Sequence, residues 1–367
     1  MKASSLTASF LLAAALGGCG DSEPVPVGSG VDAPVVELPA RQATVSGMVF
    51  DPEALYVQYM STEEPGDDPG VFDGIPYLAA SVVPEARVRL YGPGLTDVTS
   101  DASSGGGHWQ VQGVLSNDTV PYVAEAIPPE GGVVFHSDES TPFEMPPATY
   151  YPTTHLRPIQ VSRTQCIAQT ALMVGSAGAL DAVAQHLTAQ GTATTVADLV
   201  NPARTGGVVL FWVHTPSFFY DFYLGSLDEV AGEASAGTLL ALDWAAPEGL
   251  PGQSPLGFSV LPDPVSHIGY FALVLPPGAT QPVQVTFTDT HPPPAPEEEM
   301  GPYGFRPLPI EPFTVTPRPG ISVQRVRAGF NYPPHEPDPL EDPHPPEEDV
   351  SWLCQAPPPP DEHAGEE

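Results

Sequence analysis

Residues 86–94 read ARVRLYGPG, a stretch that alternates charged and apolar side chains and then turns. Val88 and Leu90 fall on one face, between arginines that fall on the other, which is the two-residue period of a half-buried strand. The glycines and proline that follow are typical turn residues. Similar stretches at 108–114 (HWQVQGV) and 121–126 (PYVAEA) lead us to predict a mainly β fold.

A second group of strands is expected in the C-terminal half of the chain. It begins at 207–213, GVVLFWV, a continuous apolar run typical of a strand buried on both faces. Further alternating or apolar stretches follow at 268–275, 283–288, 313–316 and 321–327. We therefore predict two tandem β-sandwiches of the immunoglobulin-like or transthyretin-like kind.

Helical signals separate the two groups of strands. Leu180, Val183, Ala184 and Leu187 recur at the spacing of one helix face. Thr195 stands three residues before an aspartate, the pattern of a capping box at the start of a second, short helix. These signals predict a short helical connector that packs on a sheet.

The two groups of strands also look like diverged copies of one unit. In each group, a glycine at the first strand and a glycine before an aromatic strand lie 60 or 62 residues apart. The matched positions are Gly47 with Gly207, Gly107 with Gly269, Trp109 with Phe271, and Pro121 with Pro282. The sequence therefore predicts an internal duplication.

Four segments of the N-terminal group carry a family resemblance. They are VSGMVFD at 45–51, the strand segment at 82–90, the turn and aromatic strand at 101–109, and PYVA at 121–124. Together they resemble the carboxypeptidase regulatory-like domain, a small transthyretin-like β-sandwich, over residues 43–127. The resemblance implies the fold but no chemistry, because such domains accompany enzymes without supplying catalytic groups. A long insertion after the first strand departs from the family pattern.

The first 19 residues have the pattern of an export signal. Lys2 supplies the positive start, and the apolar run at 8–16 is shorter than the roughly 20 residues that span a bilayer. Two glycines precede Cys19, which resembles the lipobox of bacterial lipoproteins and implies that Cys19 becomes the acylated first residue. Gly20 after it resembles the Gram-negative pattern for the outer membrane. The other interpretation is an ordinary signal peptide with an incidental cysteine.

Composition completes the predicted organisation. Proline, glycine and serine dominate 19–42, which is typical of a flexible tether, and proline and acidic residues dominate the C-terminal tail. The predicted segments are a signal peptide (1–18), a tether (19–42), the regulatory-like β-sandwich (43–165), a helical connector (166–204), a second β-sandwich (205–331) and the tail (332–367).

The chain is strongly acidic. It has 11 basic and 45 acidic residues and a formal net charge of −34, and its single lysine is Lys2. Such a body repels nucleic acid and anionic membrane surfaces, so we expect no nucleic-acid partner. The acidic surface either attracts cationic partners or only keeps an exported protein soluble.

Cys166 and Cys354 remain as a pair if Cys19 carries lipid. Exported proteins lie in an oxidising compartment, so we predict a disulfide between them, with two free thiols as the alternative. The bond would clip the tail to the middle of the chain and would let the apolar residues at 350–353 dock.

Two side-chain clusters are candidate binding sites. An acidic loop suits calcium, which prefers oxygen ligands, although the spacing matches no EF-hand and a solvated loop is the other interpretation. Its members are Glu63, Glu64, Asp67, Asp68 and Asp73. An aromatic run suits a glycan or a protein if it is exposed, and the core if it is buried. Its members are Phe218, Phe219, Tyr220 and Tyr223.

The sequence has no HExxH, GxSxG, Walker or dinucleotide-binding motif. We expect a non-enzymatic, lipid-anchored protein of the cell envelope, at the outer membrane, that binds or supports a protein or polysaccharide partner. We expect no catalytic residue and, calcium apart, no cofactor. The alternatives are a subunit of a multi-protein envelope machine, and an anchored hydrolase, or its accessory module, that acts on envelope polymers.

Overall fold

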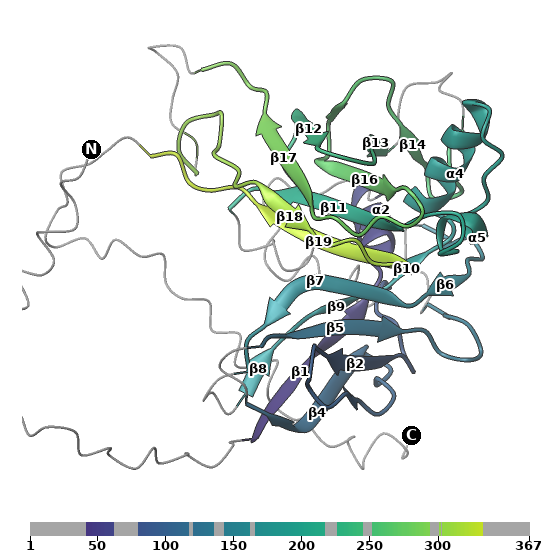
Figure 1. Ribbon diagram of the computed structural model, residues 1–367, viewed down its shortest axis with the longest axis vertical. Coiled ribbons are helices and arrows are strands. Elements are labelled where there is room, and N and C mark those ends of the chain that lie inside the picture. The colour runs from purple at the N-terminus through teal and green to yellow at the C-terminus, as the bar shows by residue number, and fades with distance from the viewer. Residues whose placement is uncertain are drawn as a thin grey trace, which may run out of the picture. The chain divides into compact units, whose positions relative to one another are not determined.

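The structure is a computed structural model, and it describes residues 42–61, 80–116, 120–135, 143–161, 166–216, 226–244, 252–293, 301 and 303–332. These residues belong to one compact unit that spans 40–367. They form two β-sandwiches, the first drawn in purple and blue and the second mainly in green and yellow (Figure 1). The predicted mainly β fold is confirmed.

The first sandwich packs two sheets around Trp109, Val45 and Leu90, which are fully buried. The strands of one sheet are β4 (His108–Leu115), β1 (Gln42–Phe50), β8 (Cys166–Ala168) and β9 (Ala171–Leu172). The facing strands are β3 (Val98–Thr99), β2 (Arg87–Tyr91), β5 (Tyr122–Ile127) and β7 (Thr153–Ile159). Residues 166–172, inside the stretch expected as a connector, thus pair with β1.

The second sandwich packs its sheets around Phe211, Phe271 and Phe287. The strands of its larger sheet are β14 (Phe258–Val260), β13 (Thr238–Trp244), β16 (Tyr270–Leu275), β11 (Gly207–His214) and β19 (Ile321–Arg327). The facing strands are β15 (Val265–Ser266), β12 (Val230–Ala234), β17 (Val283–Asp289) and β18 (Phe313–Val315). All eight residues of β11 are buried, as its continuous apolar run predicts.

The equivalent strands of the two sandwiches pair in the same way, as the predicted duplication requires. β1 lies antiparallel to β4 and parallel to β8, and β11 lies antiparallel to β16 and parallel to β19. In the facing sheets, β2, β5 and β7 are antiparallel neighbours, as are β12, β17 and β18. Even single hydrogen bonds repeat: Val49 N–H donates to Gly107, and Val213 N–H to Gly269, both at 2.8 Å.

One predicted match between the copies is wrong. Gly47 lies opposite Trp109, whereas the residue opposite Phe271 is Phe211, so Gly47 corresponds to Phe211 and not to Gly207. The two glycines sit in different surroundings, because an added Cβ would meet the backbone of Gln169 at Gly47 and that of the segment before β19 at Gly207. Their similar spacing from the next glycine is coincidental.

Strand β7 joins the two sandwiches. It pairs antiparallel with β5 of the first and parallel with β19 of the second, with Thr153 opposite Ile321 and His155 opposite Val323. Figure 1 shows β7 beside β19 and β5. One sheet of nine strands therefore runs through both sandwiches, in the order β14-β13-β16-β11-β19-β7-β5-β2-β3.

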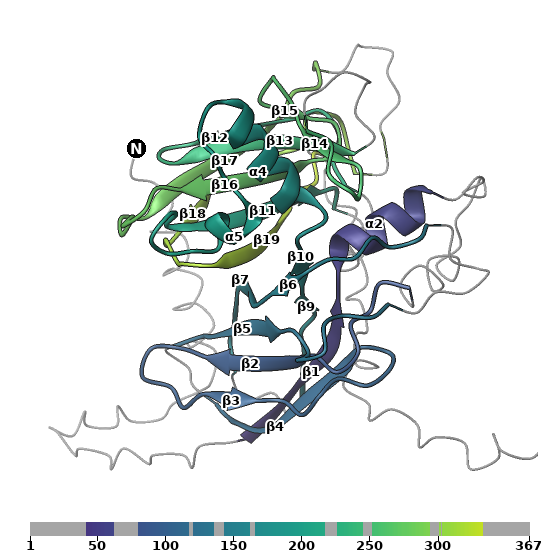
Figure 2. The same cartoon turned by 90° about the vertical axis from the view of Figure 1, so that its right-hand side faces the viewer.

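Among the described residues, three helices cover the other face of the larger sheet. They are α2 (Pro52–Met60), α4 (Ala179–Ala189) and α5 (Val196–Leu199), and they pack with Trp212 and Tyr270 in a shared core. Figure 2 shows α2 continuing from the upper end of β1. The helix predicted from Leu180 to Leu187 and the capping box of Thr195 and Asp198 are confirmed, whereas the first residues of the stretch expected as a connector form strands. Helix α2 was not predicted, because seven of its nine residues are buried and its sequence has no polar face.

Candidate functional site

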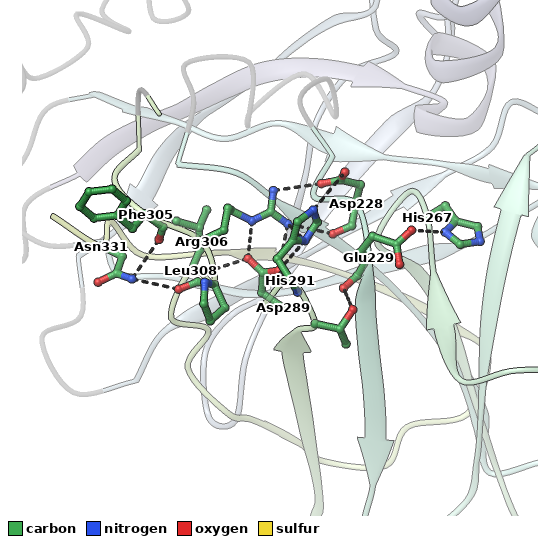
Figure 3. Close-up of polar contacts among 11 residues, drawn as sticks. Asp228, Glu229, His267, Asp289, His291, Phe305, Arg306, Leu308 and Asn331 are labelled. Atoms are coloured by element: carbon green, nitrogen blue, oxygen red, sulfur yellow. Dashed lines mark hydrogen bonds and ion pairs between the residues drawn. The ribbon is translucent and has the colours of Figure 1, made fainter. Parts of the chain in front are cut away.

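Asp289 ends β17 and fastens a loop to the second sandwich. Its fully buried carboxylate accepts hydrogen bonds from Nε and Nη2 of Arg306 at 2.5 and 2.9 Å (Figure 3). It also accepts the backbone amides of Leu308 at 2.7 Å and His291 at 3.1 Å. Burial opposes ionisation, but these donors outweigh it and hold the pKa of Asp289 below its usual range. The carboxylate is therefore charged at neutral pH and locks the loop in place.

The network continues from Arg306 to the surface. Nη1 of Arg306 donates to the carboxylate of Asp228 at 3.0 Å, and Nη2 donates to its backbone carbonyl at 3.1 Å. His291 Nδ1 lies 2.7 Å from the same Nη2, and His267 Nδ1 lies 2.7 Å from the carboxylate of Glu229. We call Asp228, Asp289, His291 and Arg306 the ion-pair network. No three metal-ligating side chains of the described residues form a metal site.

Asn331 ties the segment after β19 to the same loop. Its side-chain amide donates to the carbonyls of Phe305 at 2.9 Å and Pro307 at 3.1 Å, the residues on either side of Arg306. Backbone hydrogen bonds join Asn331 to Tyr303 and Phe305 as well. The segment that ends the described chain is thus anchored, through the loop, to the buried carboxylate of Asp289.

Exposed aromatic rings flank this anchor. Phe330 is 41% and Tyr332 45% exposed, and their rings are nearly parallel, with centroids 5.5 Å apart and planes at 15°. The ring of Tyr303 lies 6.3 Å from that of Phe330. Other exposed large apolar side chains of the described residues include Leu115 and Val134, and Val134 lines a hollow with Phe135 and Phe143. We call Tyr303, Phe330 and Tyr332 the aromatic stack.

A second polar group lies in the core where α2 meets α4 and β16. Asp51 caps α2 by accepting the amide of Glu53 at 2.8 Å, and it accepts the hydroxyl of Tyr150 at 2.6 Å. Glu53 accepts the hydroxyl of Tyr270 at 2.6 Å and the amide of Ala179, the first residue of α4, at 2.9 Å. Helix α4 has no side-chain cap of its own, so Glu53 supplies it from another helix.

The two carboxyl groups have no cationic partner among the described residues. Burial raises the pKa of Asp51, and burial together with the charge of Asp51 raises that of Glu53. Asp51 is 0% and Glu53 1% exposed, so the pair is out of reach of a substrate. Its evident role is to fasten α2 to α4 and β16.

His155 is a buried group of a different kind. It lies on β7 where the two sandwiches join, it is 1% exposed, and neither ring nitrogen has a hydrogen-bond partner among the described residues. Burial, with smaller contributions from Arg325 and Arg157, lowers its pKa well below the usual range. The ring is therefore neutral at physiological pH and acts as a core residue.

Most of the predicted site residues lie outside the described residues. Cys19, Cys354, the acidic loop at 63–73 and the aromatic run at 218–223 all do, so the calcium, binding and lipidation predictions stay predictions. Cys166 lies in β8, opposite Thr44 of β1. Within the described residues, no helix has the length and apolar character that a bilayer span requires.

Sequence reasoning missed the aromatic stack and the ion-pair network. Phe330 and Tyr332, two positions apart just after the last strand, are a signal that could have been found. Asp289 and Arg306 belong to no motif, and only the fold brings them together.

Comparison with known proteins adds little. No family model matches the chain, and no curated protein does. Among solved structures, the Bacillus anthracis TIE protein matches 79% of this chain at 9% identity with a TM-score of 0.20, and this chain spans 34% of its length. The shaft pilin SpaA of Lactobacillus rhamnosus GG matches 80% of this chain and 100% of its own length, at 10% identity with a TM-score of 0.19. A putative adhesin of Bacteroides ovatus matches 68% of this chain and 72% of its own length, at 7% identity with a TM-score of 0.19. TM-scores this low carry no argument about this chain.

Proposed function

We propose that this chain is a lipid-anchored, non-enzymatic binding or structural module of the cell envelope. The lipobox-like sequence that ends at Cys19 supports the anchor, and the composition of 19–42 supports a tether between anchor and body. The observation that carries the binding role is the aromatic stack, held on an ion-paired support.

Three features favour the aromatic stack as a contact surface. Exposed apolar side chains of a monomer are normally scattered, so neighbouring exposed aromatic rings are unusual. Tyrosine and phenylalanine are enriched where proteins contact partners. The backbone beneath the rings is fixed by Asn331 and by the pair of Asp289 and Arg306, so little conformational entropy is lost on binding.

The charge of the chain limits the partner. A net charge of −34 repels polyanions, so an uncharged polysaccharide or a neutral or basic protein fits this surface best. Aromatic faces stack equally well on the apolar faces of sugar rings and on apolar side chains. The binding experiment below distinguishes a polysaccharide partner from a protein partner.

The test uses the full chain and two double variants. Phe330→Ala with Tyr332→Ala removes two rings of the aromatic stack, and Leu115→Ala with Val134→Ala removes exposed apolar side chains elsewhere. Binding to purified envelope polysaccharide and cross-linking to envelope proteins are measured separately. We expect the first variant to bind its partner at least about tenfold more weakly, and the control to bind like the wild type. Unchanged binding of the first variant in both assays would overturn the proposal.

A further inference from the structure

The second sandwich extends one of its sheets at an edge where the first sandwich ends. Strand β16 lies beside β11 as β4 lies beside β1, with Phe271 opposite Phe211 and Trp109 opposite Gly47. In the second sandwich, β13 adds to the outer edge of β16 through residues 238–242. Among the described residues, β4 pairs with β1 alone, so no strand takes the place of β13. Figure 2 shows β4 at the lower margin of the first sandwich.

The backbone of β4 presents hydrogen-bonding groups at this edge. Both backbone groups of His108 point away from β1, because its N–H donates to Oγ of Ser104 at 3.2 Å and its carbonyl accepts the amide of Ser104 at 2.9 Å. Directions alternate along an antiparallel strand, so the N–H and C=O groups of Gln110 and Gln112 point the same way as those of His108. The register with β1 shifts only after Val111, and the exposed side chain of Gln112 shows that the alternation continues to that residue.

The edge of β4 is open and uncharged. Gln112 is exposed and Gln110 is half-buried, and no other strand of the described residues bonds to their outward backbone groups. Native proteins commonly block such an edge with charged side chains or proline. Residues 102–116 contain neither, although the chain has 45 acidic residues and 49 prolines. An added strand therefore meets no charged side chain on β4 itself.

The charge of the whole chain limits what can add to this edge. Two copies that met through β4 would each carry a formal net charge of −34, which opposes their association. A segment with basic or uncharged side chains has no such penalty. The charge therefore favours a different protein over a second copy of this chain.

We propose that an extended segment of a partner protein, with basic or uncharged side chains, adds to β4 as an antiparallel strand. It lies opposite Gln110 and Gln112, as Leu240 and Thr238 of β13 lie opposite the equivalent residues of β16. Backbone hydrogen bonds supply the affinity, and side chains on alternate faces of the added strand select the partner. This surface is separate from the aromatic stack, so it does not rest on the binding role proposed for that stack.

Binding of a synthetic peptide to the full chain tests the edge of β4. The probe is an end-blocked peptide of alternating valine and threonine with a lysine at each end, and calorimetry measures its affinity. Gln112→Pro removes the outward N–H but no donor to β1, so it should bind the probe about fivefold more weakly than the wild type does. Gln112→Thr keeps that N–H and is the matched control, which should bind like the wild type. No binding to the wild type, or equal binding to Gln112→Pro, would rule the proposal out.

Methylation of the backbone of the probe gives a second readout that needs no protein variant. Only alternate amides of an added strand face β4, so methylation of one alternate set should abolish binding and methylation of the other set should not. Equal affinities of the two methylated probes would contradict strand addition. The probe with glutamate in place of both lysines should bind more weakly, because the chain repels it.

Sedimentation of the full chain without the probe distinguishes a second copy from a partner. A dimer that Gln112→Pro dissolves would mean that β4 pairs with itself, and it would contradict the proposal. The double variant of Phe330 and Tyr332 should bind the probe like the wild type. Failure of strand addition is therefore distinguishable from failure of the aromatic stack as a contact surface.

Discussion

At the scale of single residues, the chain handles buried charge in two ways. Asp289 is ionised, because Arg306 and two backbone amides surround it. Glu53 has no cation among the described residues and shares its site with Asp51, so its charged form is disfavoured. The first arrangement fixes a surface loop beneath the aromatic stack, and the second fastens the helices to the core.

Replacing Asp289 should be costly. Asp289→Ala leaves Arg306 without its buried partner and should lower the free energy of unfolding by about 3 kcal/mol. Asp228→Ala is the matched control, because Asp228 contacts the same arginine but is 58% exposed, and it should cost less than about 1 kcal/mol. Urea unfolding measures both. Equal losses would show that Asp289 does not anchor the loop.

Glu53 should make stability depend on pH. Its pKa is raised in the folded chain and ordinary, near 4.5, in the unfolded chain, so the folded chain binds more protons between these values. The free energy of unfolding should therefore fall as pH rises from about 4.5 through neutrality, by up to about 1.4 kcal/mol per pH unit. Glu53→Gln is neutral and keeps the accepting oxygen, so its curve should be flatter. Identical slopes for both proteins in urea unfolding would refute this assignment.

At the scale of elements, the sequence predicted those helices and strands whose residue spacing is regular. The alternation at 86–91, the helical spacing at 180–187 and the capping box at Thr195 all became the expected elements. Strands such as β7 and β12, which contain Pro158 or Gly232, give no clear period and were missed. The ion-pair network could not be predicted, because only the fold brings Asp289 and Arg306 together and no sequence motif contains both.

The equivalent turns of the two copies should respond alike to mutation. Gly107 and Gly269 have φ of +72° and +62°, and an added Cβ would lie 2.7 Å from the carbonyl of Val49 in one copy and 2.6 Å from that of Val213 in the other. Gly107→Ala and Gly269→Ala should each cost about 3 kcal/mol.

Gly94→Ala is the control for these turns. Its φ is +73°, but nothing lies within 4 Å of an added Cβ, so only the backbone strain of about 1 kcal/mol should remain. Thermal unfolding compares the three variants. A mild effect at either Gly107 or Gly269 would argue against equivalent turns.

At the scale of the whole molecule, the nine-stranded sheet and the core beneath α2 and α4 make the two sandwiches interdependent. Both sheet and core cross the boundary between them, through β7 and through Glu53. We expect one cooperative unfolding transition, with equal calorimetric and van't Hoff enthalpies. Gly269→Ala should lower the stability of β4 in the first sandwich as much as that of β16, measured by hydrogen exchange. Two separate transitions would show that the sandwiches are independent.

The proposed role of the whole molecule is that of an anchored binding module, and one measurement tests the anchor directly. The native protein, extracted from membranes, is weighed intact by mass spectrometry. We predict a mass that begins at Cys19 and includes acyl chains, with a gain of two hydrogens on reduction of the bond between Cys166 and Cys354. A soluble, unacylated product would contradict the lipid anchor and with it the placement of this chain in the envelope.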